Sequence, residues 1–402
     1  MKSFTWRLVI LGAFVSSASF AAPRAVPAEW KLMAERGRYA IATAQPIDGL
    51  FPSWSNGFLA GDAGCSNVTR PPTSGGSCGR VYLAGVYNNL TYYDDDGAGT
   101  FPQRAAIANP FAVTVAGKAE FVASALDLEL GKILNRSWVP CGEGGDGIEV
   151  ELATWAHQRD RHLLIFEVRA LNLSTSSCEG SGILRVNLAS CSIDLEGTSE
   201  DFFVQAREEA NRSVISWQLE VRAMESPPGG SSIPSWPATR AGVAFETLPS
   251  TLVLTAASPT ARFHSVFTSS LEKHPWYTPT QEFRNSSGDD RSNERSGYPN
   301  PREEADRALA ELVHNSGPVR GVLEPPDTAV LCAWAASDAA HAAAWGSVWR
   351  GGVEVEGNAT MALAVNASVY ALVASLRADW PLGASPGGLS RNAYEVRLQH
   401  TA

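Results

Sequence analysis

The chain has 402 residues, of which 44% are hydrophobic and 18% are charged. This composition is typical of a globular protein and excludes global disorder, and the length corresponds to two or three domains of about 150 residues each. The 42 acidic and 32 basic side chains give a net charge of -10. Nucleic acid is therefore not expected as a partner, because binding phosphates requires a positive surface.

The first 22 residues have the pattern of a secretory signal peptide. Two basic residues, an apolar stretch and a small-x-small cleavage site follow one another: Lys2, Arg7, 8–15 and Ser19-Phe20-Ala21. The apolar stretch is short for a bilayer core of about 30 Å, which favours cleavage over a retained anchor. We expect residues 1–22 to be removed, residues 23–49 to lead into the first domain, and the mature protein to be secreted or vacuolar/lysosomal, with no membrane segment.

Glycosylation signals and cysteines agree with that route. The chain has eight Asn-x-Ser/Thr triplets, at Asn67, Asn89, Asn135, Asn172, Asn211, Asn285, Asn358 and Asn366. Six cysteines fit an oxidising compartment, and the disulfide candidates are Cys65 with Cys78 and Cys178 with Cys191. Each pair would close a loop of roughly 14 residues, worth about 3 kcal/mol. Cys141 and Cys332 remain, and a buried free thiol is equally plausible for Cys332. No CxxC occurs and no His is spaced to complete a zinc site, so no metal site is expected. No cofactor is expected either.

Residues 50–271 have the two-residue period of β-strands. The segment 162–173 opens with an apolar run and then alternates, and further strands are predicted at 148–155, 182–188, 214–224, 251–256 and 262–268. Polar, glycine-rich turn segments separate them. Many strands without intervening helices predict a large antiparallel sandwich.

The acidic residues within this region are interpreted as solvated. Asp94-Asp95-Asp96 precedes Gly97, and a solvated turn is favoured there over a Ca²⁺ site. The i, i+2 pairs Asp127/Glu129 and Glu149/Glu151 are predicted to face solvent from one side of a strand. His157 and His162 lie at a strand–turn–strand junction, where a ligand role is not favoured.

Residues 272–350 are predicted to be a linker with helices. Asn300-Pro301 supplies a cap and a first-turn proline for a helix that reaches His314. A second helix is expected from Ser337 to Trp349, and a third, 358–377, is apolar nearly all round. A helix of that kind is expected to be buried in a larger helical assembly.

Six segments in order resemble glycoside hydrolase family 65. They are 55–61 (SNGFLAG), 85–88 (GVYN), 104–111, 126–130 (LDLEL), 341–357 and 385–390 (SPGGLS). The last is the most specific, because it is close to the form found in the hydrolase branch. The resemblance covers about residues 50 to 395, and it ends after Tyr394, where the family continues with a Gly-His-x-Phe-Trp-Asp stretch that this sequence lacks.

The resemblance implies a mainly β N-terminal super-sandwich (50–271), α linker helices (272–350) and the truncated start of an (α/α)6 barrel (351–402). It implies inverting cleavage of an α-glucosidic bond, in trehalose or glucosylgalactosyl-hydroxylysine, with the catalytic carboxyl groups beyond the C-terminus. Gly387 and Gly388 are the expected substrate-binding backbone, and a carbohydrate is the expected partner. The alternatives are a non-catalytic carbohydrate-binding sandwich and a structural secreted sandwich.

Overall fold

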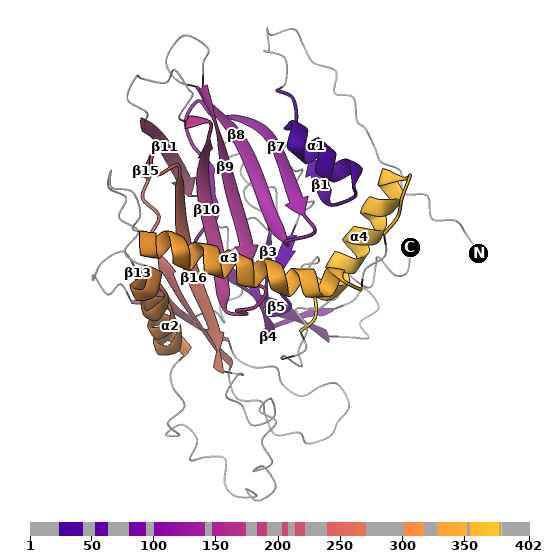
Figure 1. Cartoon of the computed structure of the whole chain (residues 1–402). Coiled ribbons are helices and arrows are strands. Elements are labelled where there is room, and N and C mark those ends of the chain that lie inside the picture. The colour runs from indigo at the N-terminus through magenta and orange to yellow at the C-terminus, as the bar shows by residue number, and fades with distance from the viewer. Residues whose placement is uncertain are drawn as a thin grey trace, which may run out of the picture.

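Two layers of antiparallel strands form the body of the protein, and helices cover the outer face of the larger layer (Figure 1). The computed structural model describes residues 24–42, 53–62, 80–93, 100–140, 147–173, 183–190, 203–207, 214–221, 239–270, 301–316, 328–351, 354–377 and 379. The mainly β fold with helices after it is thus confirmed, while the start of an (α/α)6 barrel stays a prediction.

The larger layer is a nine-stranded sheet in the order β1-β7-β8-β9-β10-β16-β14-β13-β12. These strands are β1 (Tyr39–Ala42), β7 (Glu120–Asp127), β8 (Lys132–Pro140), β9 (Gly147–Ala156), β10 (Leu163–Leu171), β12 (Phe203–Arg207), β13 (Val214–Val221), β14 (Thr239–Glu246) and β16 (Thr260–Ser269). The opposing layer consists of a three-stranded and a four-stranded sheet, in the orders β15-β11-β6 and β2-β3-β4-β5. Their strands are β2 (Ser53–Ser55), β3 (Leu59–Asp62), β4 (Arg80–Tyr93), β5 (Thr100–Ala108), β6 (Val113–Val115), β11 (Ile183–Ser190) and β15 (Thr251–Thr255).

The central strand β10 is buried on both faces, which explains the apolar run in its sequence. Leu164 and Phe166 point into the core between the two layers, where the Phe166 ring stacks on Phe111 with centroids 5.5 Å apart. Leu163 and Ile165 point the other way, into a second core beneath the helices. Successive side chains of a strand alternate between faces, so a strand covered on both sides is apolar at successive positions.

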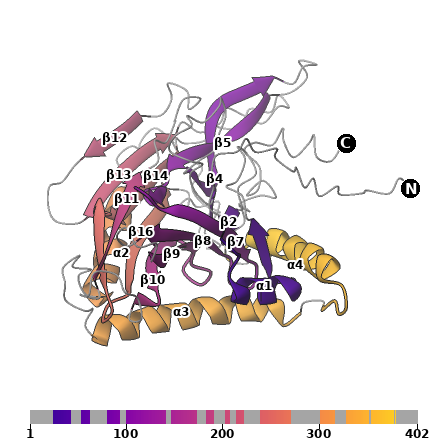
Figure 2. The same ribbon diagram turned by 90° about the horizontal axis from the view of Figure 1, so that it is seen from above.

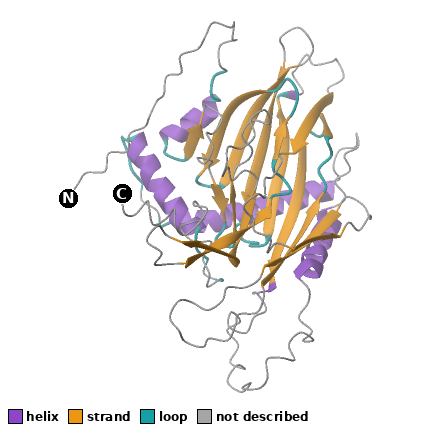
Figure 3. Ribbon diagram, turned by 180° about the vertical axis from the view of Figure 1, so that it is seen from behind, coloured by secondary structure: helices purple, strands orange, loops and turns teal. Residues whose placement is uncertain are grey.

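Four helices lie around the nine-stranded sheet: α1 (Ala28–Glu35), α2 (Pro301–Ser316), α3 (Thr328–Trp349) and α4 (Ala359–Ala374). Seen from above, α3 runs along one side of the strand layers, and α4 turns away from its end beside α1 (Figure 2). From behind, α3 lies on the far side of the strands (Figure 3). Among the described residues, no helix has both the length and the hydropathy that a membrane span requires.

The helix α2 begins at Pro301, as predicted, and packs closely on the sheet. A Cβ on Gly242 of β14 would lie 2.4 Å from the Pro301 carbonyl carbon, and the Thr268 hydroxyl donates a 2.6 Å hydrogen bond to the Pro301 oxygen. The absence of a side chain at Gly242 therefore allows the first turn of α2 to contact the strand.

The predicted start of the second helix at Ser337 is wrong, because α3 begins at Thr328. A start at Ser337 would place Asp338 in the first turn of the helix, where a carboxylate is favoured. It lies instead in the middle of α3, and its carboxylate accepts a 2.8 Å hydrogen bond from Arg262 of β16. The acidic residue binds the sheet and does not mark a helix terminus.

The tryptophans of α3 hold this helix on the rest of the molecule. Trp345 is fully buried and stacks on Tyr370 of α4, with ring centroids 5.5 Å apart. Trp349 donates a 3.0 Å hydrogen bond from its Nε1 to the Glu129 carbonyl oxygen. The two side chains share one face of α3, as their spacing of four predicts.

Candidate functional site

The site begins at the tight turn between β2 and β3, residues 55–58, which has the sequence SNGF. Gly57 has a φ of +84°, in the region that favours glycine. A Cβ at this position would lie 2.4 Å from Arg377 Cγ and 2.5 Å from the Leu376 carbonyl oxygen. The glycine is therefore required both by the turn and by the approach of the chain that follows α4.

Asn56 in the same turn connects it to the turn between β9 and β10, residues 157–162. Its side-chain oxygen accepts the N–H groups of Phe58 and Leu59 at 3.0 and 2.8 Å. Its amide nitrogen donates to the carbonyl oxygens of His157 and Arg161 at 2.9 and 3.1 Å. The side chain is fully buried and uses all four of its hydrogen-bonding positions, so it holds the two turns in a fixed relation.

His157 links the β9–β10 turn to α3. Its Nδ1 accepts the Asp160 N–H at 2.9 Å, and its Nε2 donates to the Ser337 carbonyl oxygen at 3.0 Å. This pattern requires a neutral ring, because one nitrogen must keep its lone pair. Burial lowers the pKa of His157 below its usual range, in agreement with the neutral form.

His341 of α3 lies beside it in the same arrangement, with the ring centroids 5.3 Å apart. Its Nδ1 accepts the Gln158 N–H at 3.0 Å, and its Nε2 donates to the Leu130 carbonyl oxygen at 2.7 Å. Burial, with help from the Lys132 charge, lowers the pKa of His341 to about 3. The two neutral histidines form a fully hydrogen-bonded contact between α3 and the loops of the sheet.

Arg377, just after α4, joins the two turns from the other side. Its Nη1 donates to the carbonyl oxygens of Asn56 and Gln158 at 3.1 and 2.9 Å. Its Nε and Nη2 donate to the two carboxylate oxygens of Asp379 at 2.7 and 3.2 Å. These hydrogen bonds from Arg377 lower the pKa of Asp379, so this carboxylate is ionised while about half of it remains exposed to solvent.

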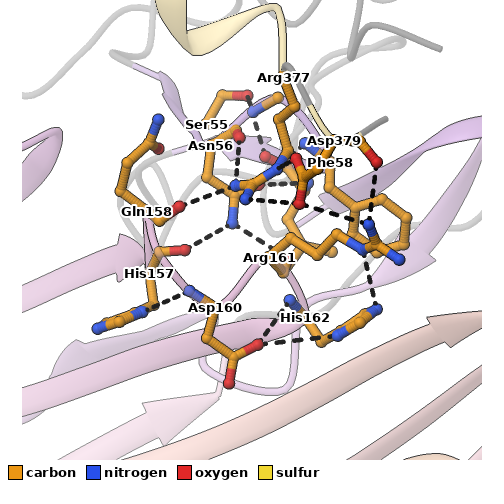
Figure 4. Close-up of polar contacts among 12 residues, drawn as sticks. Ser55, Asn56, Phe58, His157, Gln158, Asp160, Arg161, His162, Arg377 and Asp379 are labelled. Carbon is orange, nitrogen blue, oxygen red and sulfur yellow. Dashed lines mark hydrogen bonds and ion pairs between the residues drawn. The ribbon is translucent and has the colours of Figure 1, made fainter. Parts of the chain in front are cut away.

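An open pocket of about 470 Å³ lies where these segments meet (Figure 4). It is lined by His157, Arg159, Asp160, Arg161, His162, Ala340 and Asp379. The volume falls within the usual range for small-molecule sites. All but one of these side chains are polar, so the pocket suits a ligand that forms hydrogen bonds.

A second group of charged residues lies buried between α3 and the nine-stranded sheet. Glu167 of β10 accepts hydrogen bonds from Arg262 at 2.6 and 3.0 Å and from Arg169 at 2.7 Å. Arg262 also reaches Asp338 of α3. Glu167 does not line the pocket, and its two oxygens are occupied, so this group holds the helix on the sheet. Among the described residues, no three His, Cys, Asp or Glu side chains are grouped to hold a metal ion.

The prediction that the acidic i, i+2 pairs face solvent is wrong for one member of each pair. Glu151 is buried, and its carboxylate accepts a 2.7 Å hydrogen bond from Arg136. Asp127 is 5% exposed and accepts the N–H groups of Glu129 and Leu130. Burial raises the pKa of Asp127 to about 6. The face that carries these carboxylates is covered by other parts of the chain, which the period of the strand does not show.

Several predicted site residues lie outside the described residues. These are Gly387, Gly388, Cys65, Cys78, Cys141, Cys178, Cys191, Asn67, Asn211 and Asn285. Asp94, Asp95 and Asp96 also lie outside them, and Asn89 lies in β4 at a position where only the backbone is described. The predictions for all of these residues stand as made. Cys332 is exposed on α3 with a free thiol, so the alternative of a buried thiol is wrong.

The described glycosylation signals differ in accessibility. Asn172 is exposed at the end of β10, and Asn135 is half-buried within β8. Asn358 is exposed, and its side-chain oxygen caps α4 by accepting the Met361 N–H at 3.0 Å. Asn366 is half-buried, and its Nδ2 donates to the Gly37 carbonyl oxygen at 2.9 Å. The Asn366 nitrogen that would carry a glycan is therefore engaged in the contact between α4 and the segment after α1.

The comparisons with known proteins agree with the resemblance to glycoside hydrolase family 65: one is a short match in sequence and the other a match in fold. A segment of 54 residues is 43% identical to the protein-glucosylgalactosylhydroxylysine glucosidase of Dictyostelium discoideum. This segment is 13% of this chain and 8% of that protein. The fold is similar to that of a putative kojibiose phosphorylase from human microbiome, with a TM-score of 0.50 and 11% identity over 84% of this chain. The chain spans 42% of the length of that structure. No family model matches.

Sequence reasoning missed most residues of the pocket. It noted the SNGF segment only for its resemblance and placed His157 and His162 at a turn without a role. Arg377 and Asp379 carried no signal, because their importance depends on contacts with residues more than 200 positions away. The SNGF turn was the one available indication, since a glycine after an asparagine marks a tight turn.

Proposed function

We propose that this protein is part of a secreted or vacuolar enzyme that cleaves an α-glucosidic bond by inversion, in trehalose or a glucosylgalactosyl-hydroxylysine unit. The observation that carries the proposal is the 43% identity over 54 residues to a glucosidase that is named for the second of these substrates. The likeness of the fold to a glycoside phosphorylase supports a carbohydrate as substrate.

The two carboxyl groups that such a reaction needs are assigned to a further helical domain. An inverting glycosidase places an acid and a base about 6.5–9.5 Å apart, on opposite sides of the scissile bond. In the described pocket, Asp379 is ionised and bound by Arg377, which makes it unsuitable as the proton donor. Asp379 therefore does not supply the acid of this pair.

The outer faces of α3 and α4 suit the contact with that domain. The only charged side chain of α3 is Asp338, which faces the sheet, and α4 has none. Large apolar side chains lie on the outer surface of these helices: Leu331 is 48% exposed, Met361 54% and Leu372 64%. Exposed apolar surfaces of this kind mark contacts with other protein surfaces.

Size-exclusion chromatography tests this contact. The chain on its own is expected to self-associate, and Leu372→Glu is expected to reduce the association. Leu32→Glu is the matched control, because Leu32 is 49% exposed on α1 and the substitution adds the same charge. If the wild-type protein is monomeric and binds no hydrophobic dye, the proposal that the outer faces of α3 and α4 contact a further domain is contradicted.

The activity is tested with a purified enzyme that includes the proposed further helical domain and with three substrates: trehalose, kojibiose and glucosylgalactosyl-hydroxylysine. Proton NMR follows the release of glucose and its anomeric configuration, with and without inorganic phosphate. Hydrolysis with inversion supports the proposal. Release of glucose 1-phosphate that depends on phosphate would show that the reaction is phosphorolysis and not hydrolysis.

The alternative is a carbohydrate-binding protein without catalysis. The pocket favours it, since its polar groups suit binding and its Asp379 is held as an ionised acceptor. Saccharide binding without turnover of any of the three substrates supports this alternative.

A further inference from the structure

The pocket formed by the β9–β10 turn, α3 and the segment after α4 has a chemistry that narrows its ligand. Two arginines, Arg159 and Arg161, and two aspartates, Asp160 and Asp379, line it. Their formal charges cancel, which disfavours both a strongly anionic and a strongly cationic ligand. Ala340 is the only apolar residue among those that line the pocket.

Both carboxylates have capacity for a ligand. Asp160 is half exposed, and its Oδ1 accepts the His162 N–H at 3.2 Å, with no hydrogen bond to Oδ2 among the described residues. Asp379 is 54% exposed, and its carboxylate accepts hydrogen bonds from Arg377 and, at 3.5 Å, from Arg161. A carboxylate can accept about four hydrogen bonds. Asp160 therefore retains most of its capacity, and Asp379, which accepts three, retains one position for a ligand hydroxyl group.

Donors complement these acceptors. Arg159 is exposed and lines the pocket, and none of the ion pairs among the described residues includes it. Its guanidinium can donate several hydrogen bonds in a planar fork. A ligand with many hydroxyl groups, each able to donate and accept, matches this mixture of acceptors and donors.

The backbone that carries these groups is fixed before any ligand binds. Asn56 holds the carbonyl groups at both ends of the β9–β10 turn, and Arg377 holds the turn and Asp379 together. The guanidinium of Arg161 also lies over the Phe58 ring, 5.5 Å from its centroid. Groups held in this way lose little conformational entropy on binding, which favours affinity.

We propose that this pocket is a binding subsite for a neutral saccharide, in which Asp160 and Asp379 accept hydrogen bonds from hydroxyl groups and Arg159 donates hydrogen bonds to hydroxyl oxygens. The subsite is formed by the β9–β10 turn, α3 and the segment after α4. The proposal rests on the proposed carbohydrate function and deepens it by assigning residues to the substrate.

Isothermal titration calorimetry with kojibiose and trehalose tests the subsite in the full chain. Asp379→Asn keeps the shape of the side chain and removes its charge, and the affinity for saccharide is expected to fall about tenfold or more, as for a lost charged hydrogen bond. Arg159→Ala is expected to weaken binding in the same direction, and because this side chain is exposed and unpaired among the described residues, the fold should remain intact.

Glu120→Gln is the matched control. Glu120 is 57% exposed and pairs with Arg24, so it resembles Asp379 in exposure and in its arginine partner, but it lies at the start of β7 outside the pocket. Its substitution is expected to leave saccharide binding unchanged.

The outcomes separate this proposal from the proposed function. Saccharide binding that is equal in wild type, Asp379→Asn and Arg159→Ala overturns the subsite and leaves the carbohydrate function standing. Displacement of the saccharide by millimolar inorganic phosphate also overturns it, in favour of an anion site. Absence of saccharide binding by the wild-type chain overturns the subsite, and if turnover is detected at the same time, the carbohydrate function survives without it.

Discussion

The neutral histidine His341 makes the attachment of α3 sensitive to acid. It accepts a backbone N–H with one ring nitrogen and donates to a carbonyl oxygen with the other. Protonation would place a second N–H against the Gln158 N–H and would add a charge near Lys132. His341→Gln removes the titrating ring and keeps an amide that can both donate and accept, so it is the substitution of choice.

The magnitude follows from the pKa values. The pKa of His341 is about 3 in the folded protein and 6.5 is its ordinary value. The unfolded chain therefore binds a proton at a higher pH than the folded protein, and the contribution of His341 to stability is complete above pH 6.5 and is lost as the pH falls toward 3. Each pH unit within this window costs about 1.4 kcal/mol, which gives about 2 kcal/mol at pH 5.

Urea unfolding followed by circular dichroism, at pH 7 and at pH 5, measures this effect. At pH 7, His341→Gln should be less stable than wild type by about 1–3 kcal/mol, since one hydrogen bond is poorly replaced. At pH 5 the difference should be smaller by about 2 kcal/mol. Burial raises the pKa of Asp127 to about 6, which has the opposite effect on stability. This contribution is present in both wild type and His341→Gln, so it cancels in the comparison.

Trp349→Phe is the control for this experiment. It removes another hydrogen bond of α3, from Trp349 Nε1 to the Glu129 carbonyl oxygen, and it changes no titratable group. Its stability difference from wild type should be the same at both pH values. If the His341→Gln difference were also independent of pH, the reasoning from a buried neutral histidine would be refuted.

Three further results are expected. Asn56→Ala should lower the free energy of unfolding by about 3 kcal/mol or more, because four buried backbone groups lose their partner; a change below about 1 kcal/mol in urea unfolding would contradict this role. Gly57→Ala should destabilise far more than Gly117→Ala, since both glycines have positive φ but only a Cβ at Gly57 meets other atoms; equal midpoints would refute the packing argument. In protein secreted from eukaryotic cells, peptide mapping should find a glycan on Asn172 and none on Asn366, and a fully occupied Asn366 would contradict the observed contact with Gly37.

The sequence alone determined the local structure over much of the chain. The two-residue period of 162–173 and its neighbours predicts the strands, and Asn300-Pro301 predicts the start of α2, because these signals depend on residues close in sequence. The SNGF segment likewise contributed to the resemblance to the family. Its Gly57 is required locally by the positive φ of the turn and, over a long distance in sequence, by the close approach of Arg377.

The tertiary structure alone decided which charged side chains are buried and where the pocket lies. The period of a strand shows which side chains share a face, but it does not show what covers that face. Asp127 and Glu151 therefore looked solvated in the sequence and are buried in the fold. The pocket is lined by the β9–β10 turn, Ala340 of α3 and Asp379. Segments so far apart in the sequence meet only when long-range packing brings them together.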